Sequence, residues 1–303
     1  MYNGTLCIEK GGEVMATWSA PGKLILFGEH AVVYGKPCIA MAIRPRVYVT
    51  VRKTSHPHHA RSLYIEQCFR EMGVRGSVYI NSQIPSSSGL GSSAAVTVAT
   101  LAAINDEFNG KKTIDEIAEL AYKIEKKVQK GRASPTDTSV STYGGMFLIL
   151  NGERKRLAPQ NHQFVIGNSQ VSHSTSRMVE RVAQFKEKEP LICEPILESI
   201  GNITYLALQH MHDPIRLGEL MDINHALLEA LGVGHPSLSR LVLASRQTGA
   251  YGAKITGAGG GGCMVALVQK NLKGRVAGAI EVFDGRAIIT SLDCEGLRQE
   301  EED

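Results

Sequence analysis

Residues 84–95 read IPSSSGLGSSAA, and they run directly into the small, apolar segment VTVATLAAINDEF, which ends at Asn109-Gly110. The glycines and serines allow several backbone N–H groups to converge on an anion, and a helix that starts there presents its positive end to the same anion. Serine hydroxyls are also oxygen donors of the kind that Mg²⁺ prefers. The lysine that ends a Walker A loop is absent, so any phosphate site here is of another type. The alternative, a flexible Ser/Gly linker, is disfavoured because linkers do not continue into buried, alanine-rich helices.

The segments around this loop mix strand-like and helix-like patterns. Strands are expected at 24–27, 47–51, 77–80, 146–150, 164–167 and 264–268. Helices are expected at 92–108, from Thr113 to about Gln129, and near 176–186, 196–211 and 215–231. Thr113 and Glu116 have the spacing of a capping box, and a loop is expected from Gly131 to Thr136. Because strands and helices alternate without a strict βαβ period, the pattern predicts an α+β fold rather than a doubly wound sheet.

Length and composition place limits on the class of protein. A chain of 303 residues is about two domains long, and the polar segment 151–161 predicts a division into residues 1–162 and 163–303. A hydrophobic fraction of 43% and a charged fraction of 21% exclude a disordered chain. The formal net charge of +3 is too small for a nucleic-acid footprint. We therefore expect no nucleic-acid partner.

The chain termini and the cysteines predict the compartment. No apolar run approaches 18 residues, and the start of the chain lacks the pattern of a signal peptide, so we expect a cytoplasmic protein without a membrane partner. The six cysteines are scattered and are expected to be reduced thiols. Residues 1–14 carry no motif and are expected to be a dispensable extension, and the acidic C-terminus is expected to be solvated.

Three other groups of residues are candidates for chemistry. Gly257 to Gly262 hold five glycines in six positions between two strand-like segments, which indicates a loop that approaches something closely. Lys23, Glu29 and His30 follow one another around the expected strand 24–27, although each alone fits a structural role. Glu125 is followed by two lysines, for which the ordinary interpretation is a solvated helix face, but it also lies beside the apolar stripe of its helix and can point at the edge of the core. Asp137 fits an N-cap or a turn.

Taken together, these motifs resemble the GHMP kinases, a family named after galacto-, homoserine, mevalonate and phosphomevalonate kinases. Three family motifs occur here in order: APGKLILFGEHAVVYG at 20–35, IPSSSGLGSSAA at 84–95 and KITGAGGGGC at 254–263. The resemblance covers the chain from about residue 17 onward. Residues 28–35, 133–145 and 224–238 are similar to the mevalonate-phosphorylating branch in a short form typical of archaea and bacteria. The step from Glu125 to Asp137 is one residue longer than in that branch, with Lys130 as the apparent insertion.

The resemblance implies a fold and a reaction. The family fold has an N-terminal, ATP-binding domain like ribosomal protein S5 and a ferredoxin-like C-terminal domain, with the active site between them. The implied reaction transfers a phosphoryl group from ATP to the primary hydroxyl of mevalonate, with Mg²⁺ as cofactor. A homodimer is an assembly that the sequence leaves open.

The resemblance also assigns roles to residues. Asp137 would orient or deprotonate the hydroxyl, and Lys23 beside it would offset charge on the transferring phosphoryl. The phosphates would bind along the loop formed by Pro85, Ser86, Ser87, Ser88, Gly89, Leu90, Gly91, Ser92, Ser93 and Ala94. Ser93 and Glu125 would hold Mg²⁺. Lys23, Glu29, His30, Asp137 and Gly259 would contact the substrate, with the imidazole suited to its carboxylate.

Two alternatives stay open at this point. A sister enzyme that phosphorylates homoserine or phosphomevalonate shares these motifs, although a phosphorylated substrate would need a basic cluster that the motifs lack. A binding-only sensor on the same fold would be expected to have lost Lys23, Asp137 or the serine pair, and all of them are present. The stretch HPHHAR at 56–61 is a weak candidate for a metal site, because Pro57 interrupts it and no carboxylate or cysteine lies nearby.

Overall fold

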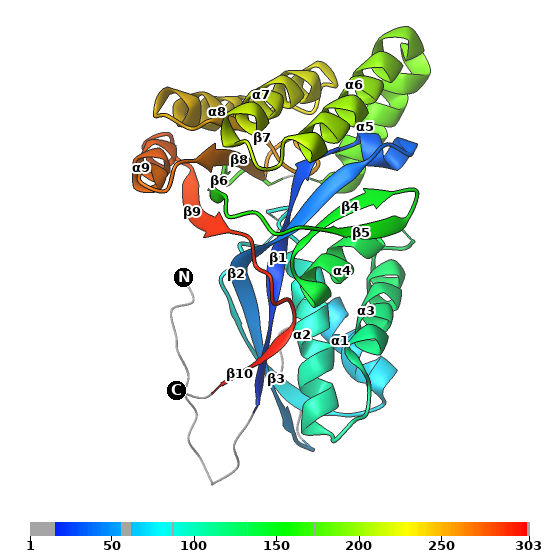
Figure 1. Ribbon diagram of the computed structural model, residues 1–303. Helices are drawn as coiled ribbons and strands as arrows, with labels where there is room; N and C mark the ends of the chain where they lie inside the picture. The colour runs from blue at the N-terminus through cyan, green and yellow to red at the C-terminus, as the bar shows by residue number, and fades with distance from the viewer. Residues whose placement is uncertain (1–15, 56–61, 87, 132, 173, 302–303) are drawn as a thin grey trace.

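The structure is a computed structural model that describes residues 16–55, 62–86, 88–131, 133–172 and 174–301. These residues form two antiparallel sheets, each covered by its own helices (Figure 1). Since helices and antiparallel strands are mixed, the predicted α+β class is confirmed. The extension at residues 1–14 and the stretch HPHHAR lie outside the described residues.

The first sheet has the strand order β10–β1–β2–β4–β5, and β3 also pairs with β2. Its strands are β1 (Thr17–Phe27), β2 (Cys38–Lys53), β3 (Gly76–Ser82), β4 (Met146–Leu150), β5 (Glu153–Leu157) and β10 (Arg298–Glu300). A short 3-10 helix, η1 (Ala31–Tyr34), connects β1 to β2. Its α-helices are α1 (Leu63–Met72), α2 (Ser92–Glu107), α3 (Ile114–Val128) and α4 (Pro135–Tyr143).

The second sheet has the order β7–β8–β6–β9. Its strands are β6 (Gln163–Asn168), β7 (Gly252–Ile255), β8 (Cys263–Val268) and β9 (Arg286–Ser291). Its helices are α5 (Thr175–Lys188), α6 (Pro190–Gln209), α7 (Pro214–Ala230), α8 (Pro236–Gln247) and α9 (Lys273–Val282). The predicted boundary near residue 162 falls in the connection between β5 and β6, where the chain leaves the first sheet for the second.

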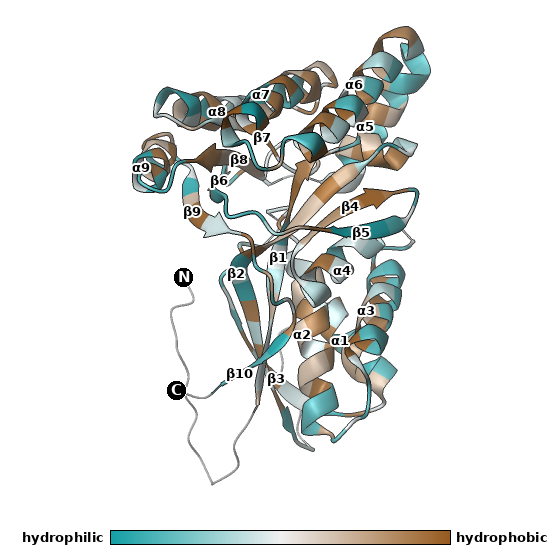
Figure 2. Ribbon diagram, viewed as in Figure 1, coloured by the Kyte–Doolittle hydropathy of each residue, from teal (hydrophilic) through white to brown (hydrophobic). Residues whose placement is uncertain are grey.

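Apolar patterning explains the central helices. In α2, ten residues from Ala94 to Ile104 are buried, and their small side chains let the helix lie close to β1 and β2. The predicted capping box of α3 is present, because Thr113 accepts a hydrogen bond from the Glu116 backbone and Glu116 accepts one from Thr113. Hydrophobic segments accordingly face the interior of both layers (Figure 2). The six expected strands and five expected helices are all present, although β1 begins seven residues, β2 nine residues and α6 six residues earlier than expected.

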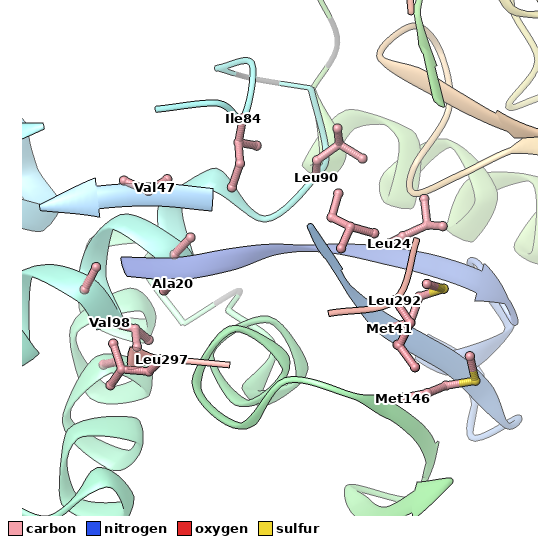
Figure 3. Close-up of a cluster of buried hydrophobic side chains, with 14 of the residues drawn as sticks. Ala20, Leu24, Met41, Val47, Ile84, Leu90, Val98, Met146, Leu292 and Leu297 are labelled. Carbon is pink, nitrogen blue, oxygen red and sulfur yellow. The ribbon is translucent and has the colours of Figure 1, made fainter. Parts of the chain in front are cut away.

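The prediction of a solvated C-terminal tail, GLRQEEED at 296–303, is wrong over residues 296–300. Leu297 is buried, and Figure 3 places Leu292 and Leu297 in the same hydrophobic cluster as Leu24 and Met41. Strand β10 pairs with β1 in antiparallel register. The last segment of the chain therefore returns from the second sheet to complete the first one.

A buried cation explains why this acidic segment is held. Arg46 is 3% exposed, and its guanidinium donates to Asp293 and to the Gly296 carbonyl. A buried guanidinium needs an anion and several acceptors, and the returning segment supplies them. The Ser19 hydroxyl accepts a further hydrogen bond from Arg46 at 2.7 Å and donates one to Glu300.

Helix α6 bears on the expectation that the chain has no membrane-spanning segment. By length and composition it could cross a membrane, with a mean hydropathy of 1.2 over an 18-residue window. Its buried residues, among them Leu197, Ile200 and Ile203, contact the hydrophobic core of the second layer or the neighbouring first layer. Its other face carries carboxylates, and Glu198 is ion-paired with Lys36. We interpret α6 as a helix that contributes to the core.

Candidate active site

A cavity of about 490 Å³ lies where the three motifs meet. Its size is typical of a pocket for small ligands. Its walls come from strands β1 and β2, from η1 and from helix α5, together with the ends of α1, α3 and α4. Two loops complete them: the Ser/Gly loop of residues 84–91, called the phosphate loop below, and the glycine run of residues 257–262. The lining residues are Lys23, Ile25, Glu29, His30, Val32, Val33, Cys38, Tyr64, Ser88, Gly89, Gly91, Ser92, Ser93, Gln129, Ser134, Thr136, Asp137, Thr175, Val179, Gly257 and Ala258.

Lys23 and Asp137 form an ion pair in this cavity. The distance from Lys23 Nζ to Asp137 Oδ1 is 3.2 Å, and the two side chains are 9% and 30% exposed. Asp137 lies in the first turn of α4, where the helix dipole stabilises a carboxylate. Ser134 caps that helix and Pro135 occupies its first position, so the local sequence sets where Asp137 begins to project.

The phosphate loop is built against Lys23. The Lys23 backbone N–H donates to the Leu90 carbonyl at 2.9 Å, and Gly91 is the N-cap of α2 with a φ of 74°. A Cβ atom on Gly91 would lie 2.6 Å from Lys23 Cγ, so only glycine fits this close approach. The N-terminal end of α2 therefore opens into the cavity beside the Lys23–Asp137 pair.

Glu125 is buried beside this pair, as its position next to the apolar stripe of α3 allowed, and it does not lie on a solvated helix face. It is 1% exposed, and its Oε1 atom has no hydrogen-bond partner. Burial and the nearby charge of Asp137 raise the pKa of Glu125 to about 7. A hydrogen bond with Ser93 and the positive charge of Lys23 lower that pKa and offset only part of the rise. Lys130, the apparent insertion, adopts a left-handed conformation (φ 53°) just after α3, so the extra residue is absorbed in the turn and Glu125 stays near Asp137.

Ser93 and Glu125 fit a magnesium site in their chemistry. An unpartnered carboxylate oxygen next to a serine hydroxyl offers oxygen ligands, and Mg²⁺ in kinases is held by one or two carboxylates together with substrate phosphates. Among the described residues, no group of three His, Cys, Asp or Glu side chains that could hold a metal by itself occurs. A metal held at Glu125 would thus depend on phosphate oxygens for the rest of its ligands.

Glu29 and His30 also lie at the cavity, but their partners are within the protein. Glu29 is 1% exposed, pairs with buried Lys254 and accepts a hydrogen bond from Asn224 at 3.2 Å. The Nε2 atom of His30 lies 3.0 Å from the Ala258 carbonyl oxygen. Burial lowers the pKa of His30, and the Ala258 hydrogen bond and the Glu29 charge oppose that shift only in part.

The remaining predicted residues lie around the cavity rather than on its wall. Leu90 and Ala94 are core residues, and the Pro85 carbonyl accepts a hydrogen bond from Ser88 at 2.7 Å. Gly259 faces away, since a Cβ there would lie 2.2 Å from the Val233 carbonyl oxygen. Ser86 is described but does not line the cavity, and Ser87 lies outside the described residues.

Several wall residues carry no sequence motif. Tyr64 lies in the first turn of α1, Gln129 is the C-cap of α3, and Thr175 and Val179 lie on α5, which faces the cavity from the second layer. Gln129 and Thr175 lie next to the ends of predicted helices, Val179 lies within a predicted helix, and Tyr64 lies on a helix that the sequence pattern did not predict. The sequence could not predict that α5 lines the cavity, because its position there depends on how the two sheets are placed relative to each other.

Comparison with known proteins matches the chain to family models on both sides of the cavity. The model of the GHMP kinase N-terminal domain matches residues 59–145, and the model of the GHMP kinase C-terminal domain matches residues 204–282. A third model, the galactose-binding signature of galactokinases, matches residues 9–53, which contain the first motif.

Whole-chain relatives give a finer placement. The mevalonate kinase of Pyrococcus abyssi is 41% identical over 93% of this chain and 97% of its own length. The crystal structure of the Methanococcus jannaschii mevalonate kinase has a TM-score of 0.82 at 30% identity and covers 92% of this chain and 99% of its own. The L. major mevalonate kinase in complex with R-mevalonate has the same fold, with a TM-score of 0.82 at 24% identity, covering 91% of this chain and 95% of its own. The chain belongs to the GHMP kinase family and, within it, to the mevalonate kinases.

Proposed function

We propose that the protein phosphorylates the primary hydroxyl of mevalonate with ATP, giving phosphomevalonate and ADP. The observation that carries this proposal is the Lys23–Asp137 pair beside the N-terminus of α2. It occurs in a chain that is 41% identical, over 93% of its length, to a mevalonate kinase. One end of the cavity thus suits a triphosphate and the adjacent pair suits a reacting hydroxyl.

Each group has a distinct role in the proposed transfer. The hydroxyl oxygen of mevalonate forms a bond to the γ-phosphorus of ATP, while the bond from that phosphorus to the β,γ-bridging oxygen breaks and ADP leaves. Asp137 orients the hydroxyl and accepts its proton. Lys23 holds Asp137 at 3.2 Å and offsets negative charge on the transferring group. The N–H groups from Gly89 to Ser92 would bind the phosphates, supported by the dipole of α2.

Magnesium is part of the same proposal. Ser93 and Glu125 would hold the ion, which would neutralise charge on the phosphates of ATP when bound. Burying a carboxylate with an unpartnered oxygen costs free energy, and metal binding would give the Glu125 carboxylate a reason to be buried despite that cost.

The proposal also includes the domain division, the cellular compartment and the oligomeric state. The division into residues 1–162 and 163–303 would separate an ATP-binding part from a part that closes the cavity with α5 and the glycine run. The described cysteines are free thiols, four of them buried, which suits a reducing compartment such as the cytoplasm. A homodimer stays a prediction.

Product identification tests the reaction directly. Protein, ATP, Mg²⁺ and mevalonate are incubated, and ³¹P NMR follows the products. A new phosphomonoester signal coupled to a CH₂ group, formed in equal amount with ADP, supports the proposal. ADP without that signal would contradict it. Because the galactokinase signature matches the first motif, galactose is the competing acceptor to include.

A further inference from the structure

A fully buried ion pair joins the first motif to the third one. Lys254, on β7, is 0% exposed, and its ammonium donates to Glu29 and, at 2.8 Å, to the Ile255 carbonyl. It also lies 5.9 Å from the centre of the Phe27 ring. A lysine without contact to water is costly unless an anion compensates it, so Lys254 and Glu29 depend on each other. The two residues are 225 positions apart in sequence.

The carboxylate of Glu29 is used within the protein. One oxygen accepts from Lys254, and the other accepts from the side-chain amide of Asn224, which is 0% exposed and lies on α7. An anionic substrate would be repelled by this carboxylate rather than bound by it. The arrangement gives Glu29 a reason to be buried that does not involve contact with substrate.

The residue after Glu29 has an unusual backbone. His30 has a φ of 60° and a ψ of −45°, and the Ala31 N–H donates to the Glu29 carbonyl at 2.7 Å. This is the rare, positive-φ form of the γ-turn, in which a side chain other than glycine is strained. Such a conformation persists only where its neighbours fix it. The neighbours here are the Glu29 side chain before the turn and the Ala258 carbonyl beyond the imidazole.

We infer that Glu29 and Lys254, together with Asn224, are positioning residues that hold His30 in its strained turn against the glycine run. The inference rests on the proposed function and revises one part of it: Glu29 acts on mevalonate binding through His30 rather than by touching the substrate. The ion pair also connects the end of β1 in the first sheet to β7 in the second. It therefore fixes the distance between the cavity wall that contains His30 and the wall that contains Ala258.

The hydrogen bond to Ala258 has a chemical consequence for His30. A carbonyl only accepts, so Nε2 must carry the hydrogen, and in a neutral ring Nδ1 then has the free lone pair. A neutral imidazole in this tautomer suits a hydroxyl donor better than a carboxylate. Loss of the Glu29 anchor is expected to release both the turn and the tautomer.

The test compares three variants at the pair with a matched control elsewhere. Glu29→Gln and Lys254→Met each leave one buried charge without its partner, and the double variant removes both charges. Asp293→Asn is the control, because it breaks another buried ion pair, with Arg46, and Asp293 does not line the cavity. Asn224→Ala is a milder change that removes one hydrogen bond to Glu29.

Steady-state kinetics and thermal unfolding are measured for all five variants. We expect Glu29→Gln and Lys254→Met to raise the KM for mevalonate at least about tenfold while the KM for ATP changes less than about threefold. The double variant is expected to recover at least about threefold in kcat/KM relative to Lys254→Met, since no unpaired charge is left. Asp293→Asn should lower the Tm by a similar amount without changing either KM.

Three kinetic outcomes would overturn the inference. If Glu29 touched the substrate, the double variant would be as poor as Glu29→Gln, with no recovery. If the pair were merely structural, Asp293→Asn would reproduce the kinetic losses at equal loss of Tm, or the variants at the pair would keep the parent KM for mevalonate.

A substrate-free readout separates this inference from the proposed function. Long-range ¹H–¹⁵N NMR, with the His30 signals assigned through His30→Gln, should show the Nε2–H tautomer in the parent and a mixture of tautomers in Glu29→Gln. An unchanged tautomer in Glu29→Gln would refute the positioning role. Failure of the parent to phosphorylate mevalonate would refute the function and leave this result standing.

Discussion

Gly91→Ala is expected to damage the active site through one methyl group. The new Cβ would lie 2.6 Å from Lys23 Cγ, where ordinary van der Waals contact begins at 3.4 Å, so the lysine must move by about 0.8 Å. The backbone cannot retreat easily, because the Lys23 N–H is bonded to the Leu90 carbonyl at 2.9 Å. The Lys23 ammonium, 3.2 Å from Asp137, would be carried along with its stem.

The cost has two parts that a control can separate. Gly91 has a φ of 74°, and a side chain in this conformation costs about 1–2 kcal/mol before any clash. Gly73, the C-cap of α1, has a φ of 67° and has nothing within 4 Å of its hypothetical Cβ. Gly73→Ala therefore measures the backbone cost alone, and the clash at Gly91 should add about 1–3 kcal/mol.

Urea unfolding and a coupled assay of ADP release give the two readouts. Gly73→Ala should lose about 1–2 kcal/mol of unfolding free energy and keep its kcat. Gly91→Ala should lose more stability, and its kcat should fall about 10²-fold, the effect of displacing a catalytic group by about 1 Å. Equal stability loss in both variants, with kcat of Gly91→Ala within a factor of about three of the parent, would refute the close fit of the loop against Lys23.

Three further outcomes follow from the same structure. Asp137→Asn should lower kcat by roughly 10²–10⁴ with ATP binding little changed, and turnover near the parent value would remove Asp137 from the chemistry. Because the pKa of Glu125 is raised to about 7, protons compete with Mg²⁺ there, so the Mg²⁺ needed for half-maximal rate should fall as pH rises toward 7 and then level off. Glu125→Gln should need more Mg²⁺ at every pH and lose that dependence, whereas a dependence identical to the parent's would exclude Glu125 as a ligand. Burial lowers the pKa of His225 to about 4 from 6.5, so the unfolded chain binds its proton first. The unfolding free energy should then fall as pH drops from 6.5 toward 4, by at most about 1.4 kcal/mol per pH unit, and His225→Gln should flatten this slope in urea titrations.

Periodicity and motif order predicted the central strands and five helices, but α1, α8 and α9 were not predicted and α4 was expected to begin as a loop. The segment PTDTSVSTY has few good helix formers, because Ser and Thr side chains compete for backbone hydrogen bonds. In the structure Ser139 donates to the Pro135 carbonyl at 2.6 Å and Thr142 to the Thr138 carbonyl at 2.7 Å, and the helix is buried. Tertiary burial overrides propensity there, and sequence alone does not show which segments will be buried.

The sequence predicted which residues form the site better than it predicted which contacts those residues make. Family motifs named Lys23, Asp137, Ser93 and Glu125, but the burial of Glu125 depends on how α3 lies against α2 and α4. Lys254 begins the third motif, but no sequence signal shows that it is buried, because its partner Glu29 lies in the turn after β1, far away in the sequence. Ion pairs between distant segments leave no periodicity in the sequence, and the same holds for Arg46 and the returning tail.

The measurement that tests the central claim most directly is substrate discrimination by the parent protein. Values of kcat/KM are determined with ATP and Mg²⁺ for mevalonate, homoserine, galactose and phosphomevalonate. The site offers the Lys23–Asp137 pair for the reacting hydroxyl and a buried imidazole whose free nitrogen suits a further hydroxyl donor. It lacks a cluster of cations for a second phosphate among its described lining residues. We predict that kcat/KM for mevalonate exceeds each of the others by at least about 10²-fold, or roughly 2.7 kcal/mol in transition-state binding. Equal or faster turnover of homoserine, galactose or phosphomevalonate would contradict the assignment of mevalonate as the substrate.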